Sequence, residues 1–176
     1  MRNRKNTRQQ LNTTIPILTD WDRKFMAYHE AGHAVCSYYL PERESLECIT
    51  INPSCEAFGM IKTQSRPHHN ETEVSFRSMI STLLAGRISE EMFLQCKTTS
   101  CIYDLISARQ IATDMVIKFG MGSTLGIQAL NYNEYPYISE SMKENICEDI
   151  QKILTESETH AKEILHEHHA EVKKNC

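Results

Sequence analysis

Apolar residues recur at three- and four-residue intervals along most of this 176-residue chain. This spacing places them on one side of an α-helix, and it predicts long helices over residues 20–39, 74–94, 103–119 and 139–172. In the last segment the apolar stripe lies opposite a charged side, which is typical of a helix that packs on a protein body or on a partner. The sequence therefore predicts a mainly α fold in one domain.

Two short segments rich in β-forming residues interrupt the helical pattern. Residues 48–51 and 58–62 flank the turn-forming segment 52–54, which reads NPS. We therefore expect a small β-hairpin here, followed by a polar loop over residues 64–72.

Composition narrows the possible functions and locations. The net charge of −4 is too small to favour a nucleic-acid partner. The first residues are polar and basic, so we expect a flexible basic tail over 1–19 and a folded domain over 20–172. Seven cysteines without a C-x-x-C pair indicate a reducing compartment, hence the cytoplasm. No long apolar run occurs, so we expect neither a membrane span nor a signal peptide.

The segment 28–34 reads YHEAGHA and lies inside the first expected helix. His29 and His33 are four residues apart, so their side chains share one helical face and can bind one cation. Zinc suits imidazole ligands and tetrahedral geometry. Glu30 lies slightly around the helix, where it can take a proton from a metal-activated water and later deliver it to a leaving amine. The competing interpretation is a helix whose histidines are ordinary surface or core residues.

A catalytic zinc site usually has three protein ligands, and the residues alone leave the third one open. His68 and His69 lie in the polar loop. Asp104 begins a later helix, where an acidic residue also interacts favourably with the helix dipole. The histidines at 160, 166, 168 and 169 are expected on the polar side of the last helix.

Three segments together resemble the protease domain of the FtsH family, a family of ATP-dependent, membrane-anchored zinc metalloproteases. They are AYHEAGHAV at 27–35, STLLAGRISEEMF at 81–93 and TTSCIYDLISARQIATDMVIKFGMGSTLG at 98–126. Residues 137–172 are similar to the family's closing helix, so the resemblance covers residues 20–172. It implies a compact helical metalloprotease domain with a small strand pair near the active site and a long C-terminal helix.

The resemblance also implies the roles of individual residues. His29, His33 and Asp104 would hold one zinc ion per chain, and Glu30 would be the catalytic base. This choice selects Asp104 among the candidates for the third ligand.

In the family, a short strand near the site pairs with the substrate backbone. Phe58, Gly59, Met60 and Ile61 match this strand, and backbone pairing would explain a broad tolerance of substrate sequence. The family's hexameric ring implies a homo-oligomer.

The chain departs from the family pattern in places. Ala85 replaces the first of two usual glycines, and residues 101–103 are bulkier than the small residues usual before the aspartate. One of Glu90 and Glu91 is expected to orient a ligand histidine. The 176 residues contain no Walker A sequence.

We therefore expect a zinc-dependent endopeptidase of the HExxH type that cleaves unfolded or flexible polypeptides. The alternative is an ATPase-lacking zinc-binding module that assembles with, and regulates, an ATP-dependent protease partner. That partner would be a separate ATPase or a full-length family member, and it would bring the chain to the membrane periphery.

Overall fold

The fold is mainly helical in a computed structural model that describes residues 18–41, 45–50, 60–64 and 70–176. The elements follow one another as α1 (Asp20–Tyr39), β1 (Ser45–Thr50), β2 (Met60–Gln64), α2 (Glu73–Leu94), α3 (Ile102–Ile117), the short 3₁₀ helix η1 (Tyr135–Tyr137), α4 (Glu140–Glu167) and α5 (His169–Lys174). The predicted helices are confirmed: α1 has the predicted ends, and the ends of α2 and α3 differ from the predicted ones by at most two residues. The predicted tail lies almost wholly outside the described residues, so the domain boundary stays a prediction.

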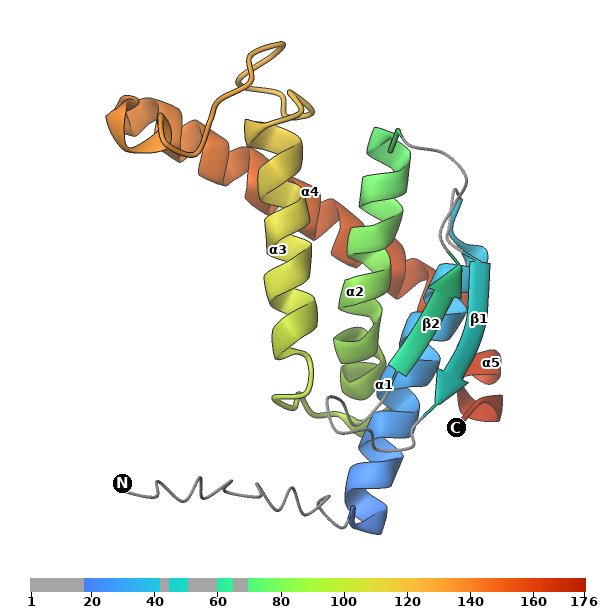
Figure 1. The fold of residues 1–176 in the computed structure, drawn as a ribbon. Helices are drawn as coiled ribbons and strands as arrows, with labels where there is room; N and C mark the ends of the chain where they lie inside the picture. Colours follow the sequence, from blue (N-terminus) through green and yellow to red (C-terminus); the bar gives the residue numbers. More distant parts are fainter. Residues whose placement is uncertain (1–17, 42–44, 51–59, 65–69) are drawn as a thin grey trace, which may run out of the picture.

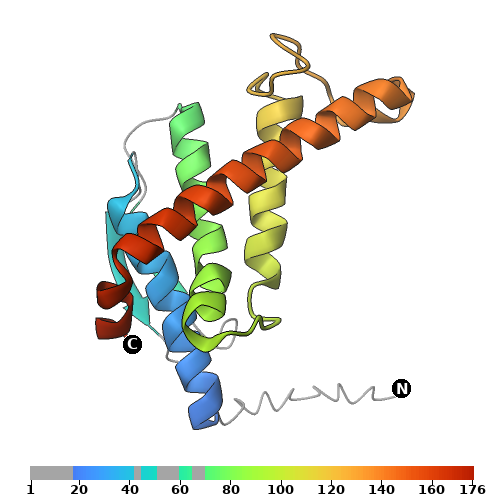
Figure 2. The same ribbon diagram turned by 180° about the vertical axis from the view of Figure 1, so that it is seen from behind.

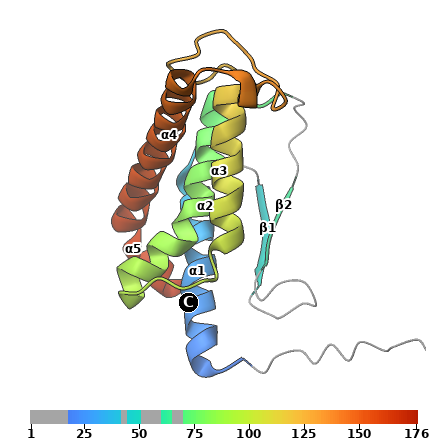
Figure 3. The ribbon, with the colours of Figure 1, turned by 90° about the vertical axis from the view of Figure 1, so that its left-hand side faces the viewer.

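The helices form two layers, and the strand pair forms a third. α1, α2 and α3 run alternately up and down, with α2 between the other two in the view of Figure 1. α4 crosses this layer diagonally on its back (Figure 2), while the strands lie on the opposite side (Figure 3). The core between the helical layers includes Val35, Ile80, Met115, Ile146 and Leu165, all buried. Burial of each such side chain contributes about 1.5–3 kcal/mol relative to exposure.

Local signals in the sequence set the ends of α1. Thr19 caps its N-terminus, because the Thr19 hydroxyl accepts from the Asp22 amide while the Asp22 carboxylate accepts from the Thr19 amide. This reciprocal pairing satisfies two amides that the helix itself leaves without partners. At the other end Leu40 has an extended backbone, as expected before Pro41. The sequence thus fixes the length of the helix that carries the two histidines.

The predicted last helix is wrong in one respect, because it is not continuous. It breaks at His168, whose φ of −104° and ψ of 25° are not helical, and α5 follows in a new direction. The break allows Val172 to become fully buried. It also lets the His168 ring stack on Tyr39 of α1 at 3.5 Å between centroids. Long-range packing on α1 therefore overrides the local helical pattern.

Two antiparallel strands, β1 and β2, pair with Ile49 opposite Ile61 and Thr50 opposite Met60. The predicted strand pair is thus present, although residues 51–59 between the strands lie outside the described part. Of the candidate substrate strand, Met60 and Ile61 begin β2, whereas Phe58 and Gly59 are not described. Among the helices described here, none has the length and apolar character needed to cross a membrane.

Candidate metal centre

The two histidines lie on the side of α1 that packs against α2. His29 and His33 are 7% and 6% exposed, so they are not surface residues. Space for their rings comes from Gly86 of α2. A Cβ atom at Gly86 would lie 2.5 Å from His33 Nε2 and 2.6 Å from His29 Cε1. The absence of a side chain at Gly86 therefore leaves room for two imidazole rings.

A second glycine provides the close approach of the two helices. A Cβ atom at Gly32 would lie 2.5 Å from Ser89 Cβ and 2.6 Å from the Ala85 carbonyl oxygen. Such distances leave no room for any side chain at Gly32. The close contact at Gly32 therefore brings α1 and α2 near each other. The absence of a side chain at Gly86 then leaves room between the two helices for the imidazole rings.

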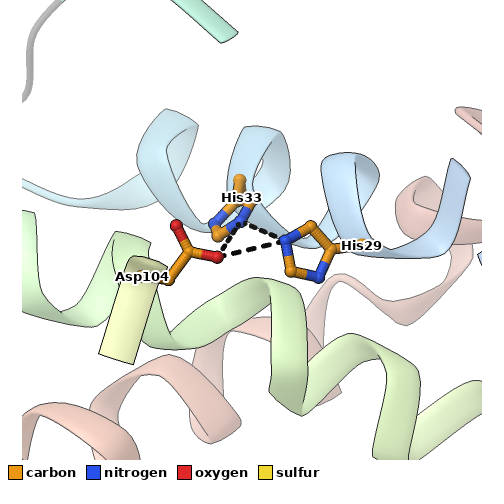
Figure 4. Close-up of side chains that lie close together, drawn as sticks. All are labelled: His29, His33 and Asp104. Atoms are coloured by element: carbon orange, nitrogen blue, oxygen red, sulfur yellow. Dashed lines mark hydrogen bonds and ion pairs between the residues drawn. The ribbon is translucent and has the colours of Figure 1, made fainter. Parts of the chain in front are cut away.

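Asp104, in the first turn of α3, completes a group of three potential metal ligands. Its Oδ2 atom lies 3.2 Å from His29 Nε2 and 3.5 Å from His33 Nε2, and the two Nε2 atoms are 3.0 Å apart. Figure 4 shows the three side chains converging on one point. The structure therefore brings together residues that are 4 and 71 positions apart in the chain.

These three residues fit a zinc ion. Ligand atoms bound to tetrahedral zinc at about 2.0–2.1 Å lie about 3.3 Å from one another. The three observed separations of 3.0, 3.2 and 3.5 Å bracket this value. Two imidazoles and one carboxylate also leave the fourth coordination position open, which is typical of catalytic zinc.

The hydrogen bonds of the two rings direct the correct nitrogen atoms to the centre. His33 Nδ1 lies 2.6 Å from the carbonyl oxygen of Thr82, which can only accept, so Nδ1 carries the proton. In the neutral ring Nε2 is then free to bind a metal. His29 Nδ1 lies 2.8 Å from Glu90 Oε1, which favours the same tautomer. Both rings are thus oriented by partners outside the metal-ligand group.

Glu90 is itself held by a turn that precedes α3. Its side chain is fully buried and accepts hydrogen bonds from the amide and hydroxyl of Thr98 and from the hydroxyl of Ser100, at 3.0, 2.9 and 2.6 Å. Glu91 instead forms an ion pair with Lys97 at 3.2 Å. The prediction that one of the two glutamates contacts a histidine is confirmed for Glu90.

Sequence reasoning missed Thr98, Ser100 and the Thr82 carbonyl. The polar TTS segment before α3 was a usable signal, since Ser and Thr in turns often bond neighbouring carboxylates. No sequence signal marks the Thr82 carbonyl, because every residue has one.

The electrostatics of the group match a site for a cation. Burial disfavours the charged form of His29, but hydrogen bonds and charges from Asp104 and Glu90 raise its pKa to about 9. Asp104 is also partly buried, yet the two histidines lower its pKa well below the ordinary value. Without metal, a protonated His29 thus carries a positive charge between two carboxylates. A metal ion bound here would supply that positive charge in its place.

Glu30 is close to the centre but is not one of the three converging ligands. Burial raises its pKa above the ordinary value of a glutamate, although the nearby His33 and His29 oppose this rise. A carboxylate with a raised pKa is a better proton acceptor.

Other predicted candidates do not join the centre. His68 and His69 lie outside the described residues. Within the described part, no second group of three metal-ligating side chains comes together, so the four C-terminal histidines form no such site there.

Two histidines four apart on a buried helix and a converging aspartate form a group that could hold a metal ion, and a glutamate directly follows the first histidine. The chain belongs to peptidase family M41, because the model of that family matches residues 16–175.

Curated relatives agree with this assignment. The chain is 31% identical over 169 residues to the ATP-dependent zinc metalloprotease FtsH of Cupriavidus metallidurans, which covers 89% of this chain and 26% of that protein. It is also 31% identical over 169 residues to FtsH of Pseudothermotoga lettingae, covering 89% and 27%. The mouse ATP-dependent zinc metalloprotease YME1L1 is 31% identical over 155 residues, covering 86% and 21%. The chain thus spans about a quarter of the length of these relatives.

Proposed function

We propose that this chain is a zinc-dependent endopeptidase that hydrolyses peptide bonds of unfolded or flexible polypeptides. The observation that carries the proposal is the convergence of His29 Nε2, His33 Nε2 and Asp104 Oδ2, with Glu30 near enough to feel the charges of all three residues. Family membership supports the same chemistry.

Each residue has a distinct role in the proposed reaction. His29, His33 and Asp104 hold the zinc, which when bound acidifies water and polarises the substrate carbonyl. The Glu30 carboxylate accepts the proton of the attacking water and then donates it to the leaving amine nitrogen. Glu90 and the Thr82 carbonyl keep the two imidazole rings in the orientation that binding requires.

Substrate delivery is the second element of the proposal. β2 pairs on one edge with β1, and no other described strand pairs with it. A strand edge of this kind can pair with an extended peptide backbone, which suits unfolded chains of varied sequence. Because the relatives are named as ATP-dependent, we propose that an ATPase supplies unfolded chains, either as part of a longer protein or as a separate subunit in an oligomeric ring.

The test compares two glutamate variants that carry the same substitution. Wild type, Glu30→Gln and Glu91→Gln are assayed for bound zinc and for cleavage of unfolded casein. Glu91 is exposed and paired with Lys97, so Glu91→Gln controls for the substitution itself. We expect all three proteins to bind one zinc, and Glu30→Gln to lose cleavage by at least about 100-fold.

Two results would contradict the proposal. Zinc binding without cleavage by wild type would leave the alternative function, a zinc-binding module that regulates an ATP-dependent partner. Unchanged zinc occupancy in Asp104→Ala would exclude Asp104 as a ligand and turn attention to His68 and His69.

A further inference from the structure

The helix that carries Asp104 begins without the usual cap. Cys101 occupies the N-cap position of α3, and it makes no side-chain hydrogen bond to an amide of the first turn. α1, α2 and α4 each have such a bond, from Thr19, Thr72 and Ser139. A first turn that lacks this bond is held less firmly, because its amides have no partners inside the helix. A different contact is therefore needed to fix the place where α3 begins.

The turn directly before α3 is bonded to α2 instead. At Oε2, Glu90 of α2 accepts from the amide and the hydroxyl of Thr98, at 3.0 and 2.9 Å. At Oε1 it accepts from the Ser100 hydroxyl at 2.6 Å. The next residue, Cys101, is buried, and its thiol donates to the Thr98 carbonyl at 3.4 Å. The segment that leads into α3 is thus fixed to a buried carboxylate on another helix.

The same carboxylate oxygen also contacts a candidate ligand on α1. Glu90 Oε1 lies 2.8 Å from His29 Nδ1, and Ser100 Oγ lies 3.5 Å from the same nitrogen. Asp104 follows Ser100 by four residues, in the first turn of α3, so a shift of the turn moves Asp104 relative to His29. Metal ligands must be held to within about 0.5 Å of the productive geometry. Even a small shift of the turn would therefore weaken metal binding.

We propose that Ser100 is a positioning residue for the metal centre, because its hydroxyl, bonded to Glu90, holds the start of α3 where Asp104 meets the two histidines. Glu90 then positions ligands on two helices, His29 directly and Asp104 through the turn. This inference deepens the proposed function and rests on its metal site, but not on peptide cleavage. Ser100 is an exposed position, so Ser100→Ala removes the hydroxyl without leaving a cavity in the core.

The experiment compares two serines that make the same kind of contact. Ser123 donates to Asp149 Oδ1 at 2.5 Å, and Asp149 is a buried carboxylate outside the group of candidate ligands. Competition with a chelator gives the zinc Kd of wild type, Ser100→Ala and Ser123→Ala. We expect Ser100→Ala to bind zinc about tenfold more weakly, and Ser123→Ala to stay within about twofold of wild type. Urea unfolding should show a loss of stability in both variants, so a merely structural role would change unfolding and not the zinc Kd.

Two further measurements test how Ser100 acts. Ser100→Thr keeps the hydroxyl and should restore tight zinc binding. In an Asp104→Ala background, Ser100→Ala should weaken zinc binding by no more than about threefold, because the ligand that it positions is already absent. The absorption spectrum of the Co²⁺-loaded protein reports on coordination geometry, and it should change in Ser100→Ala but not in Ser123→Ala.

The outcomes distinguish this inference from the proposed function. A zinc Kd of Ser100→Ala equal to that of wild type would overturn the inference. An undiminished loss in the Asp104→Ala background would also overturn it, because Ser100 would then act on His29 alone. The expected zinc affinities without cleavage of polypeptides would support the role of Ser100 and contradict only the peptidase. If wild type binds no zinc, both proposals fail.

Discussion

Glu90 and Asp149 are two buried carboxylates that the fold stabilises in the same way. Their residues are 0% and 4% exposed, and a nearby turn satisfies each one through hydroxyl and amide donors. The donors are Thr98 and Ser100 for Glu90, and Ser123 and Thr124 for Asp149. Both arrangements follow the rule that a buried charge needs several hydrogen bonds.

The two carboxylates differ in one contact. Glu90 also accepts a hydrogen bond from His29, whereas the described partners of Asp149 all belong to the segment that precedes α4. Burial and hydrogen bonding alone therefore do not indicate a functional residue. The additional hydrogen bond between Glu90 and the candidate ligand His29 does indicate one. It predicts that Glu90 contributes to metal affinity, whereas Asp149 contributes to the stability of the fold.

The largest expected effect is that of Glu90→Gln on zinc affinity. The amide cannot hold the His29 ring and the Thr98–Ser100 turn as the carboxylate does, so zinc affinity should fall about 10–100-fold. Competition with a zinc chelator measures this change. Asp149→Asn serves as the matched variant, and an equal loss of affinity there would remove the distinction between the two carboxylates.

Asp149→Ala should mainly lower the free energy of unfolding. Loss of the hydrogen bonds to Ser123 and Thr124 should cost about 2 kcal/mol, with zinc stoichiometry unchanged. Urea unfolding measures the first quantity and metal analysis the second. If stability stays within error of wild type, the segment before α4 does not depend on this carboxylate.

The same carboxylate should make stability depend on pH. Burial opposes its ionisation, yet hydrogen bonds from Ser123 and Thr124 lower the pKa of Asp149 below the ordinary value. A lowered pKa contributes stability above the unfolded-state pKa of about 4, and this contribution is lost as the pH falls through the folded-state pKa. The difference in unfolding free energy between wild type and Asp149→Asn should therefore narrow on acidification. A difference that widens at low pH would reverse the sign of this prediction.

The smallest change in the free energy of unfolding is expected at a buried hydroxyl that, unlike the two carboxylates, has no hydrogen-bond partner. Among the described residues, the Ser157 hydroxyl on α4 has no hydrogen-bond partner, although the Ser157 carbonyl accepts from Ser81 at 3.0 Å. Ser157→Ala removes the unpaired hydroxyl and should raise the unfolding free energy by about 1 kcal/mol. A loss of stability in the thermal melt would mean that the hydroxyl is satisfied in solution.

Much of the fold was predictable from local signals. Thr19 and Pro41 bound α1, and apolar spacing marks α2 and α3 to within about two residues, as is usual for helix ends. The break at His168 was not predictable, because no local breaker such as Gly or Pro lies there. It depends on the packing of α5 against the distant helix α1 and on the stacking of His168 on Tyr39 of α1.

The candidate site was predictable in part. The spacing of His29 and His33 indicates a shared ligand face, but the residues alone could not choose between Asp104 and the loop histidines. That choice depends on the tertiary fold, which places Asp104 of α3 next to His33 of α1, 71 positions earlier in the chain. The space provided by Gly86 likewise depends on the packing of two helices and not on any local pattern.

The packing at Gly32 and Gly86 has a consequence for the protein without metal. Backbone contact, and not a bound ion, fixes how far apart α1 and α2 lie at the two histidines. The ligand group is therefore preorganised, so little conformational entropy is lost when zinc binds. Removal of zinc should accordingly leave the helical fold intact, with an apo protein that reloads the metal without refolding.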